Sequence, residues 1–183
     1  MRTFLIILIT VVGVNFSSAQ KEIAGVKVAD KETFQEKELT LNGVGLREKL
    51  WFDLYVGMLY VTNKSKSADA LINSDNPMAI KLHITDSKVT QEKMVKAVNE
   101  GFENSSHGNA SKAEISKFKG FFSEKIVEGT IFDLVYMDGK TTVYRNGKKK
   151  GSVEGLEFKK ALFAIWLGKE PADDDLKDGM LGK

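Results

Sequence analysis

The chain contains 183 residues with a formal net charge of +2 and no cysteine. A charge this close to zero disfavours nucleic acid or an anionic membrane surface as the main partner. The lack of cysteine excludes disulfides, a thiol nucleophile and an acylated lipoprotein anchor. We therefore expect a domain that its hydrophobic core alone holds together.

The N-terminal segment 1–19 has a different character from the rest of the chain. Arg2 is followed by the apolar run 4–14 and then by small and polar residues that end at Ala19. This order is typical of a secretory signal peptide. The apolar run is shorter than the ~20 residues that span a bilayer, so a retained anchor is the weaker alternative. We expect cleavage after Ala19, which leaves residues 20–183 as one domain of a bacterial-type protein that is periplasmic or secreted and not inserted in a membrane.

Segments rich in valine, isoleucine, leucine and aromatic residues, separated by polar breaks, predict strands in both halves of this domain. The predicted strands are residues 22–28, 37–43, 50–61, 78–85, 130–137, 141–146 and 149–153. Asn146-Gly147 predicts a hairpin turn. The lysines that follow it are explained as a solvated turn that protects an edge strand, with a basic docking patch as the alternative.

Three further segments have apolar residues at helical spacing along one face. They are residues 90–104, 111–126 and 155–168, and weaker helical patterns occur at 67–74 and 172–177. Ser111 and Glu114 form a capping-box pattern. Helices with one apolar stripe, beside a largely antiparallel sheet, should pack as a layer on one face of that sheet, so we predict an α+β fold.

Most catalytic and metal-binding patterns are missing from the sequence. His83 and His107 stand without Cys, Asp or Glu at a metal-binding spacing, and no phosphate-binding glycine loop or serine-nucleophile motif occurs. The acidic run 173–175 lacks the glycine and glutamate of a calcium loop, and helix capping explains it better. We therefore predict neither a metal nor a cofactor.

One arginine stands beside the most apolar run of the domain. Residues 50–61 contain a single charge and have apolar side chains on both faces, which predicts a strand covered on both sides. Arg47 precedes this run. Its guanidinium offers five donors in a rigid fork suited to a carboxylate or an enolate oxygen, and the hydroxyl of Tyr55 could share the same anion. The alternative is that Arg47 pairs at the surface with Glu48 or Glu36, and that Tyr55 belongs to the core.

The same residues carry a resemblance to a known family. The segment G-V-G-L-R of residues 43–47, followed by F-D-L-Y-V-G-M-L-Y of residues 52–60, resembles the first signature of the chalcone isomerase-like proteins. Residues 156–182 contain a helical segment running into I-W-L-G and resemble the closing signature. The similarity extends from about Glu22 to Gly182. It implies an open-faced β-sandwich, in which a large antiparallel sheet and a layer of helices enclose a ligand cleft.

The resemblance also implies roles for individual residues. True chalcone isomerases cyclise an α,β-unsaturated ketone, whereas fatty-acid-binding relatives hold a fatty acid in the same cleft. Arg47 matches the arginine that stabilises the enolate in the isomerases and grips the carboxylate in the binding proteins. Tyr55 matches a tyrosine of the binding branch that is threonine in the isomerases. Lys93 matches a lysine of the isomerase helix, but Thr90 and Ala97 stand where tyrosine and asparagine are expected, which disfavours chalcone cyclisation.

Three functional hypotheses follow. In the first, the protein binds a fatty acid or similar amphiphilic carboxylate through Arg47, Tyr55 and Lys93, since an apolar cleft with a cation and a hydroxyl at its end suits such a ligand. In the second, it is an isomerase or intramolecular lyase for an enone, with Arg47 stabilising the enolate. In the third, it is a structural or envelope-interaction protein. Three phenylalanines are expected in the core, with cleft lining as the alternative: Phe118, Phe121 and Phe122.

Overall fold

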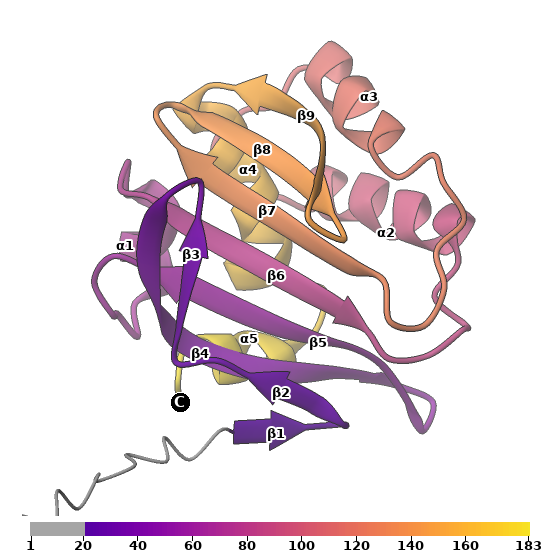
Figure 1. Ribbon diagram of the computed structural model, residues 1–183. Coiled ribbons are helices and arrows are strands. Elements are labelled where there is room, and N and C mark those ends of the chain that lie inside the picture. Colours follow the sequence, from indigo (N-terminus) through magenta and orange to yellow (C-terminus); the bar gives the residue numbers. More distant parts are fainter. Residues whose placement is uncertain (1–20) are drawn as a thin grey trace, which may run out of the picture.

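The computed structural model describes residues 21–183, so the predicted signal peptide lies outside the described residues. Its largest element is a seven-stranded antiparallel sheet in which each strand pairs with its neighbour in the chain (Figure 1). The strands of this sheet are β3 (Lys31–Phe34), β4 (Lys37–Lys49), β5 (Phe52–Val61), β6 (Met78–Ile84), β7 (Ile131–Met137), β8 (Lys140–Arg145) and β9 (Lys148–Glu154). Two short strands, β1 (Lys21–Ile23) and β2 (Val26–Val28), form a separate hairpin.

Five helices complete the described part of the chain: α1 (Ala68–Asn73), α2 (Gln91–Glu103), α3 (Lys112–Gly120), α4 (Leu156–Leu167) and α5 (Asp174–Met180). In Figure 1, α4 and α5 lie behind the sheet. None of these helices is long and apolar enough to cross a membrane. The predicted α+β class and the helical layer on a large antiparallel sheet are confirmed.

Several boundaries differ from the predicted ones. The predicted strand 22–28 is two strands, because Ala24 and Gly25 adopt φ values of 47° and 76° and reverse the chain. Strand β3 was not predicted, since its charged residues hide the apolar alternation. The predicted strand 37–43 continues past Gly43 and Gly45 to Lys49, so Arg47 lies inside a strand rather than before one.

Helix boundaries follow their capping residues. The capping box at Ser111 is confirmed: its backbone N–H donates to the Glu114 carboxylate at 2.7 Å, and the Glu114 N–H donates to the Ser111 hydroxyl at 3.2 Å. The helix it begins ends at Gly120, earlier than predicted. Asp173 accepts from the backbone N–H of Leu176 at 2.9 Å, which confirms helix capping for the acidic run.

Helix α5 packs directly on the backbone of β4. A β-carbon added to Gly43 would lie 2.2 Å from the carbonyl oxygen of Gly179, and one added to Gly45 would lie 2.5 Å from that of Leu176. No real side chain tolerates such distances, so only glycine permits this packing. The two glycines of the Gly-Val-Gly sequence therefore serve helix packing, and Arg47 is two residues beyond the second of them in the alternation of the same strand.

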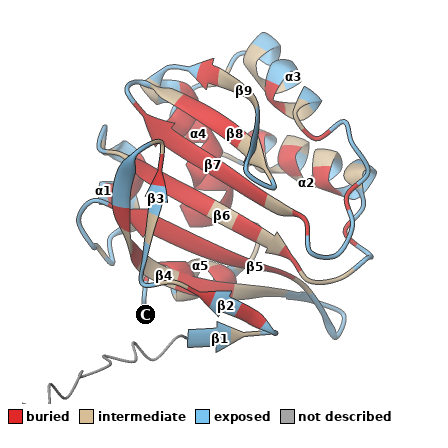
Figure 2. Cartoon of the chain, viewed as in Figure 1, coloured by how far each residue is buried: buried red, intermediate tan, exposed pale blue. Residues whose placement is uncertain are grey.

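Apolar side chains of the sheet belong to two separate core clusters, and Figure 2 shows that most of the length of the central strands is buried. One core lies between the sheet and the helices and includes every residue of α4 from Ala161 to Leu167. A second core on the opposite face includes Val56, Met58 and Tyr60 of β5. The prediction that residues 50–61 form a strand covered on both sides is confirmed from Tyr55 to Val61, whereas Phe52 and Asp53 at the start of β5 are exposed.

Candidate ligand-binding site

Arg47 and Tyr55 are direct cross-strand partners in β4 and β5. Nη1 of Arg47 donates to the hydroxyl of Tyr55 at 3.4 Å, and the guanidinium carbon lies 5.7 Å from the centre of the tyrosine ring. Among the ion pairs of residues 21–183, none involves Arg47. The alternative of a surface pair with Glu48 or Glu36 is therefore wrong, and the guanidinium keeps most of its donors for another acceptor.

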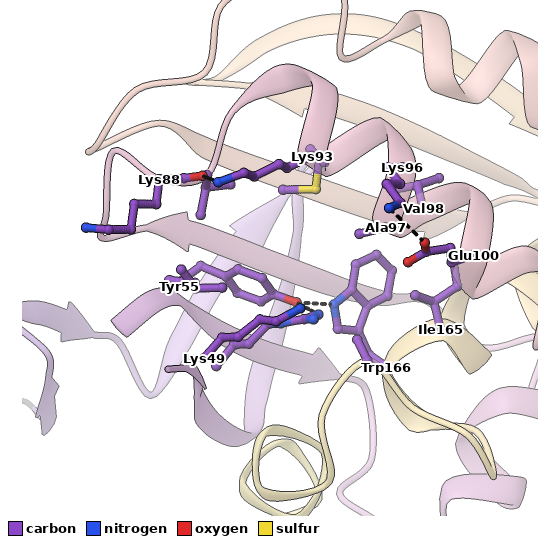
Figure 3. Close-up of a pocket in the computed structure, with 15 residues that line it drawn as sticks. Lys49, Tyr55, Lys88, Lys93, Lys96, Ala97, Val98, Glu100, Ile165 and Trp166 are labelled. Atoms are coloured by element: carbon purple, nitrogen blue, oxygen red, sulfur yellow. Dashed lines mark hydrogen bonds and ion pairs between the residues drawn. The ribbon is translucent and has the colours of Figure 1, made fainter. Parts of the chain in front are cut away.

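The hydroxyl of Tyr55 receives a second hydrogen bond from helix α4. Nε1 of Trp166 donates to it at 3.1 Å, which Figure 3 shows as a dashed line. Both residues are buried, with Tyr55 only 6% exposed and Trp166 only 3%. The hydroxyl thus accepts from two donors, and no described residue accepts its own hydrogen. A buried phenol with an unused hydrogen is poised to donate to an acceptor beside it.

The side chains of Arg47 and Tyr55 border a pocket of about 330 Å³ between the sheet and helix α2 (Figure 3). The lower limit for small-molecule sites is roughly 300 Å³, so the pocket has the size of a ligand site. Its apolar walls are formed by Leu54, Val89, Met94, Ala97, Val98, Ile165, Trp166 and Ala172.

Basic side chains are numerous in the lining of this pocket. Its lining includes five cations, Arg47, Lys49, Lys88, Lys93 and Lys96, and one carboxylate, Glu100. Glu100 is 3.7 Å from Lys96, so the acidic group is already paired. The excess of positive charge around an apolar pocket favours a ligand with an anionic end.

Lys93 lies at the same pocket as Arg47 and Tyr55, as the resemblance to the family implies. Its ammonium donates to the carbonyl oxygen of Lys88 at 3.1 Å, which leaves it two further hydrogens. Ala97 also lines the pocket, without a polar group to offer. Thr90 does not line it and instead caps α2 by accepting from the backbone N–H of Lys93 at 3.3 Å.

Sequence reasoning missed several lining residues. Lys96 and Glu100 were not predicted; together with Lys93 and Ala97, which the family resemblance had pointed to, they follow the i, i+3, i+4, i+7 spacing of one helix face, beside the predicted apolar stripe. That spacing was a usable signal for a second functional face of α2. Trp166 was assigned to an apolar stripe of its helix, and only the tertiary structure shows where its N–H points.

The phenylalanines of the predicted helical segment 111–126 lie elsewhere. Phe118 and Phe122 are fully buried, with ring centres 5.4 Å apart, and Phe118 lies 6.1 Å from the partly buried Phe121. None of the three lines the pocket. Their place in the core between sheet and helices is confirmed.

Neither histidine belongs to the pocket. His107 contacts the carboxylate of Asp69 at 2.9 Å. His83 lies on β6, where burial, and then the positive charge of Lys81, lowers its pKa. Within residues 21–183 no group of three or more His, Cys, Asp and Glu side chains is arranged to hold a metal ion.

The fold is an open-faced β-sandwich of the α+β class, in which a layer of helices covers one face of the sheet. A sequence model of the chalcone isomerase-like proteins matches residues 20–182. The chain belongs to the chalcone isomerase-like family.

A solved structure of the same fold is that of a fatty-acid binding protein from Arabidopsis thaliana. The two structures superpose with a TM-score of 0.69 at 21% sequence identity, over 86% of this chain and 92% of the plant protein. No curated protein matches the sequence significantly.

Proposed function

We propose that the protein binds a fatty acid or a similar amphiphilic carboxylate in the pocket between the sheet and α2. The carboxylate accepts hydrogen bonds from Arg47 and from the hydroxyl of Tyr55, Lys93 adds a nearby positive charge, and the acyl chain lies along the apolar walls. Charge-assisted hydrogen bonds from a guanidinium and a phenol are strong because the acceptor is ionised.

The hydrogen-bond arrangement at Tyr55 is the observation that carries this proposal. Arg47 and Trp166 both donate to the phenolic oxygen, and this polarises the O–H bond and makes it a better donor. The hydrogen has no acceptor among the described residues. An anionic oxygen in the pocket would complete the set.

The likeness to a plant fatty-acid binding protein supports the same choice at the level of the fold. The excess of basic side chains at the pocket supports it at the level of charge. An apolar pocket with basic groups in its lining matches a ligand that has an apolar body and an anionic group.

The test is a calorimetric titration of the protein with saturated fatty acids of different chain lengths. Arg47→Ala should lower the affinity about 10- to 100-fold, since hydrogen bonds to charged groups contribute about 1.5–3 kcal/mol. Lys149→Ala removes an exposed cation away from the pocket and serves as the matched control, with unchanged affinity expected. Folded wild-type protein that binds no fatty acid of any length would rule out the proposal.

An isomerase acting on an enone is the second candidate, because the donors at Arg47 and Tyr55 also suit a developing enolate oxygen. The apolar Ala97 in the pocket wall weakens it, since no hydrogen-bonding group stands there to orient a phenolate. Incubation with chalcones and simpler enones tests this candidate. Turnover that disappears in Arg47→Ala would establish it in place of simple binding.

We also propose that residues 1–19 direct the chain out of the cytoplasm and are then removed. The order of charge, apolar run and small residues supports this. The mass of the protein recovered from the producing cell should correspond to a chain that begins at Gln20. An intact Met1 in the exported fraction would contradict cleavage.

A further inference from the structure

The turn between β4 and β5 exposes three consecutive apolar side chains. Leu50 is 77% exposed, Trp51 96% and Phe52 40%, and Val127 is the one other large hydrophobic side chain exposed among residues 21–183. In Figure 2 this turn appears in pale blue at the end of the hairpin that projects beyond the sheet. Contiguous exposed apolar side chains, unlike single ones, mark a surface that binds something.

The backbone of this turn is strained as well as exposed. Leu50 and Trp51 have φ values of 50° and 71°, in the left-handed region that bulky residues avoid. Strain that persists at one place points to a use for the residues that cause it.

The other turns of the described chain show how unusual this one is. Four more residue pairs have the same combination of φ values: Ala24-Gly25, Gln35-Glu36, Asp138-Gly139 and Asn146-Gly147. Three of these pairs have glycine in second place, as such turns prefer, and the fourth is polar. Among them, Leu50-Trp51 alone places two large apolar side chains in the strained positions. The sequence of this turn therefore opposes both solubility and local stability.

The charges around the turn are arranged unevenly. Lys49 and Lys88 line the pocket beside it, and the ammonium of Lys88 lies 3.6 Å from the centre of the Phe52 ring. The two nearby carboxylates belong to Glu48 and Asp53, which are cross-strand neighbours in β4 and β5. Neither residue lines the pocket. Lys88 also lies 3.7 Å from the carboxylate of Asp86. Basic groups thus dominate on the side of the turn that faces the pocket.

We propose that the segment Leu50–Phe52 inserts into the surface of a lipid bilayer that contains anionic lipids, with Lys49 and Lys88 at the headgroups. A tryptophan at the tip suits this interface, because its ring is apolar and its N–H remains near water. Three side chains are far too few for a stable protein interface, which buries about 800 Å² on each partner. The near-neutral charge of the whole chain gives no general attraction to membranes, so the contact is local to this turn.

Because Lys49 and Lys88 also line the pocket, membrane docking here would bring this part of the pocket to the lipid surface. An amphiphile could then pass between bilayer and pocket without crossing water. This consequence rests on the proposed fatty-acid function, whereas the docking itself does not. Vesicle binding and fatty-acid binding are separate measurements, so either proposal can fail while the other stands.

The experiment uses Trp51 as its own reporter. The protein is purified from cells, and mass spectrometry checks that every variant has the same N-terminus. Each protein is then mixed with vesicles of phosphatidylcholine and phosphatidylglycerol. Tryptophan emission should shift to shorter wavelength, and lipids brominated near the headgroup should quench it. Trp51→Phe should remove the shift, because Trp166 is buried in the fold.

The decisive variant is L50N/W51G, which gives the turn the residues of Asn146-Gly147. It should fold with an unchanged or higher denaturation midpoint, bind fatty acid in solution as the wild type does, and lose at least 10-fold in vesicle affinity. Val127→Asn removes the exposed apolar side chain outside the turn and should bind vesicles normally. Lys88→Gln should weaken binding to anionic vesicles several-fold and leave the weaker binding to pure phosphatidylcholine unchanged.

Two results would overturn the proposal. One is equal vesicle binding by the wild type and L50N/W51G, with no quenching of Trp51. The other is a wild-type dimer in sedimentation that becomes a monomer in L50N/W51G, which would assign the turn to contact with a second copy of the chain.

Discussion

Helix α4 carries two buried polar side chains, Lys159 near its beginning and Trp166 near its end, and their surroundings differ in one respect. The ammonium of Lys159 donates to three carbonyl oxygens at the end of α1, at 2.8, 2.9 and 2.7 Å, those of Leu71, Ile72 and Ser74. All its hydrogens are used. Trp166 donates to Tyr55, whose own hydrogen has no acceptor in the described chain. A saturated buried group holds the fold together, whereas an incomplete one marks the place for a ligand.

If this distinction is right, removing Lys159 should affect stability and leave ligand binding unchanged. Lys159→Met keeps the length of the side chain but removes the ammonium donor from all three carbonyl oxygens, of which that of Leu71 still accepts from the backbone N–H of Ser74 at 3.3 Å. We expect the free energy of unfolding to fall by about 2–4 kcal/mol, since each unsatisfied buried group costs about 1–3 kcal/mol and loss of the buried charge offsets part of that. Urea unfolding measures this, and the fatty-acid affinity of the folded variant should equal that of the wild type.

The neighbouring lysine provides a matched control. Lys160 pairs with Glu157 at 2.7 Å, and the Glu157 side chain is 59% exposed. Lys160→Met should therefore cost less than about 1 kcal/mol, the usual range for a surface ion pair. Equal unfolding midpoints for the two variants would show that the three hydrogen bonds of Lys159 add nothing to stability. The contrast between a stabilising Lys159 and a ligand-binding Trp166 would then be wrong.

The pH dependence of stability sharpens the same point. Burial lowers the pKa of Lys159 from 10.5 to about 7, against the opposing attraction of Asp75. Between these two values the unfolded chain binds a proton that the folded chain does not, so the contribution of Lys159 to stability rises with pH and is smallest below pH 7. The stability of wild type relative to Lys159→Met should increase by up to about 1.4 kcal/mol per pH unit. Urea midpoints of both proteins at pH 7, 8 and 9 test this, and parallel curves would contradict it.

The fold was predictable to a greater extent than the site. Apolar alternation and helical stripes depend only on local spacing, and they predicted the sheet, the helical layer and the doubly covered strand β5. The extension of β4 through Gly43 and Gly45 was not predictable in this way. Its cause is the close approach of α5, a segment from the other end of the chain.

The site depends on contacts that no local pattern contains. Arg47 meets Tyr55 because of the register between β4 and β5, next to an irregularity in their pairing. Trp166 reaches Tyr55 across 111 positions of sequence. The apolar pattern of the helix already accounts for the burial of the indole ring. The pattern therefore gives no indication that the indole N–H has a specific acceptor. The resemblance to the family pointed to Arg47 and Tyr55, but only the tertiary structure shows that Trp166 contacts Tyr55.

The smallest expected effect tests whether Trp166 belongs to the site at all. Tyr55→Phe should reduce fatty-acid affinity about 5- to 10-fold through the lost hydrogen bond, about 1 kcal/mol. Trp166→Phe should reduce it less, because it only removes the polarisation of the phenol. If the indole acts through Tyr55, the double variant should bind no more weakly than Tyr55→Phe, and the cycle should show a coupling of about 0.5–1 kcal/mol. Additive losses in the same calorimetric titration would mean that Trp166 matters only by packing, and α4 would then carry one polar group of consequence instead of two.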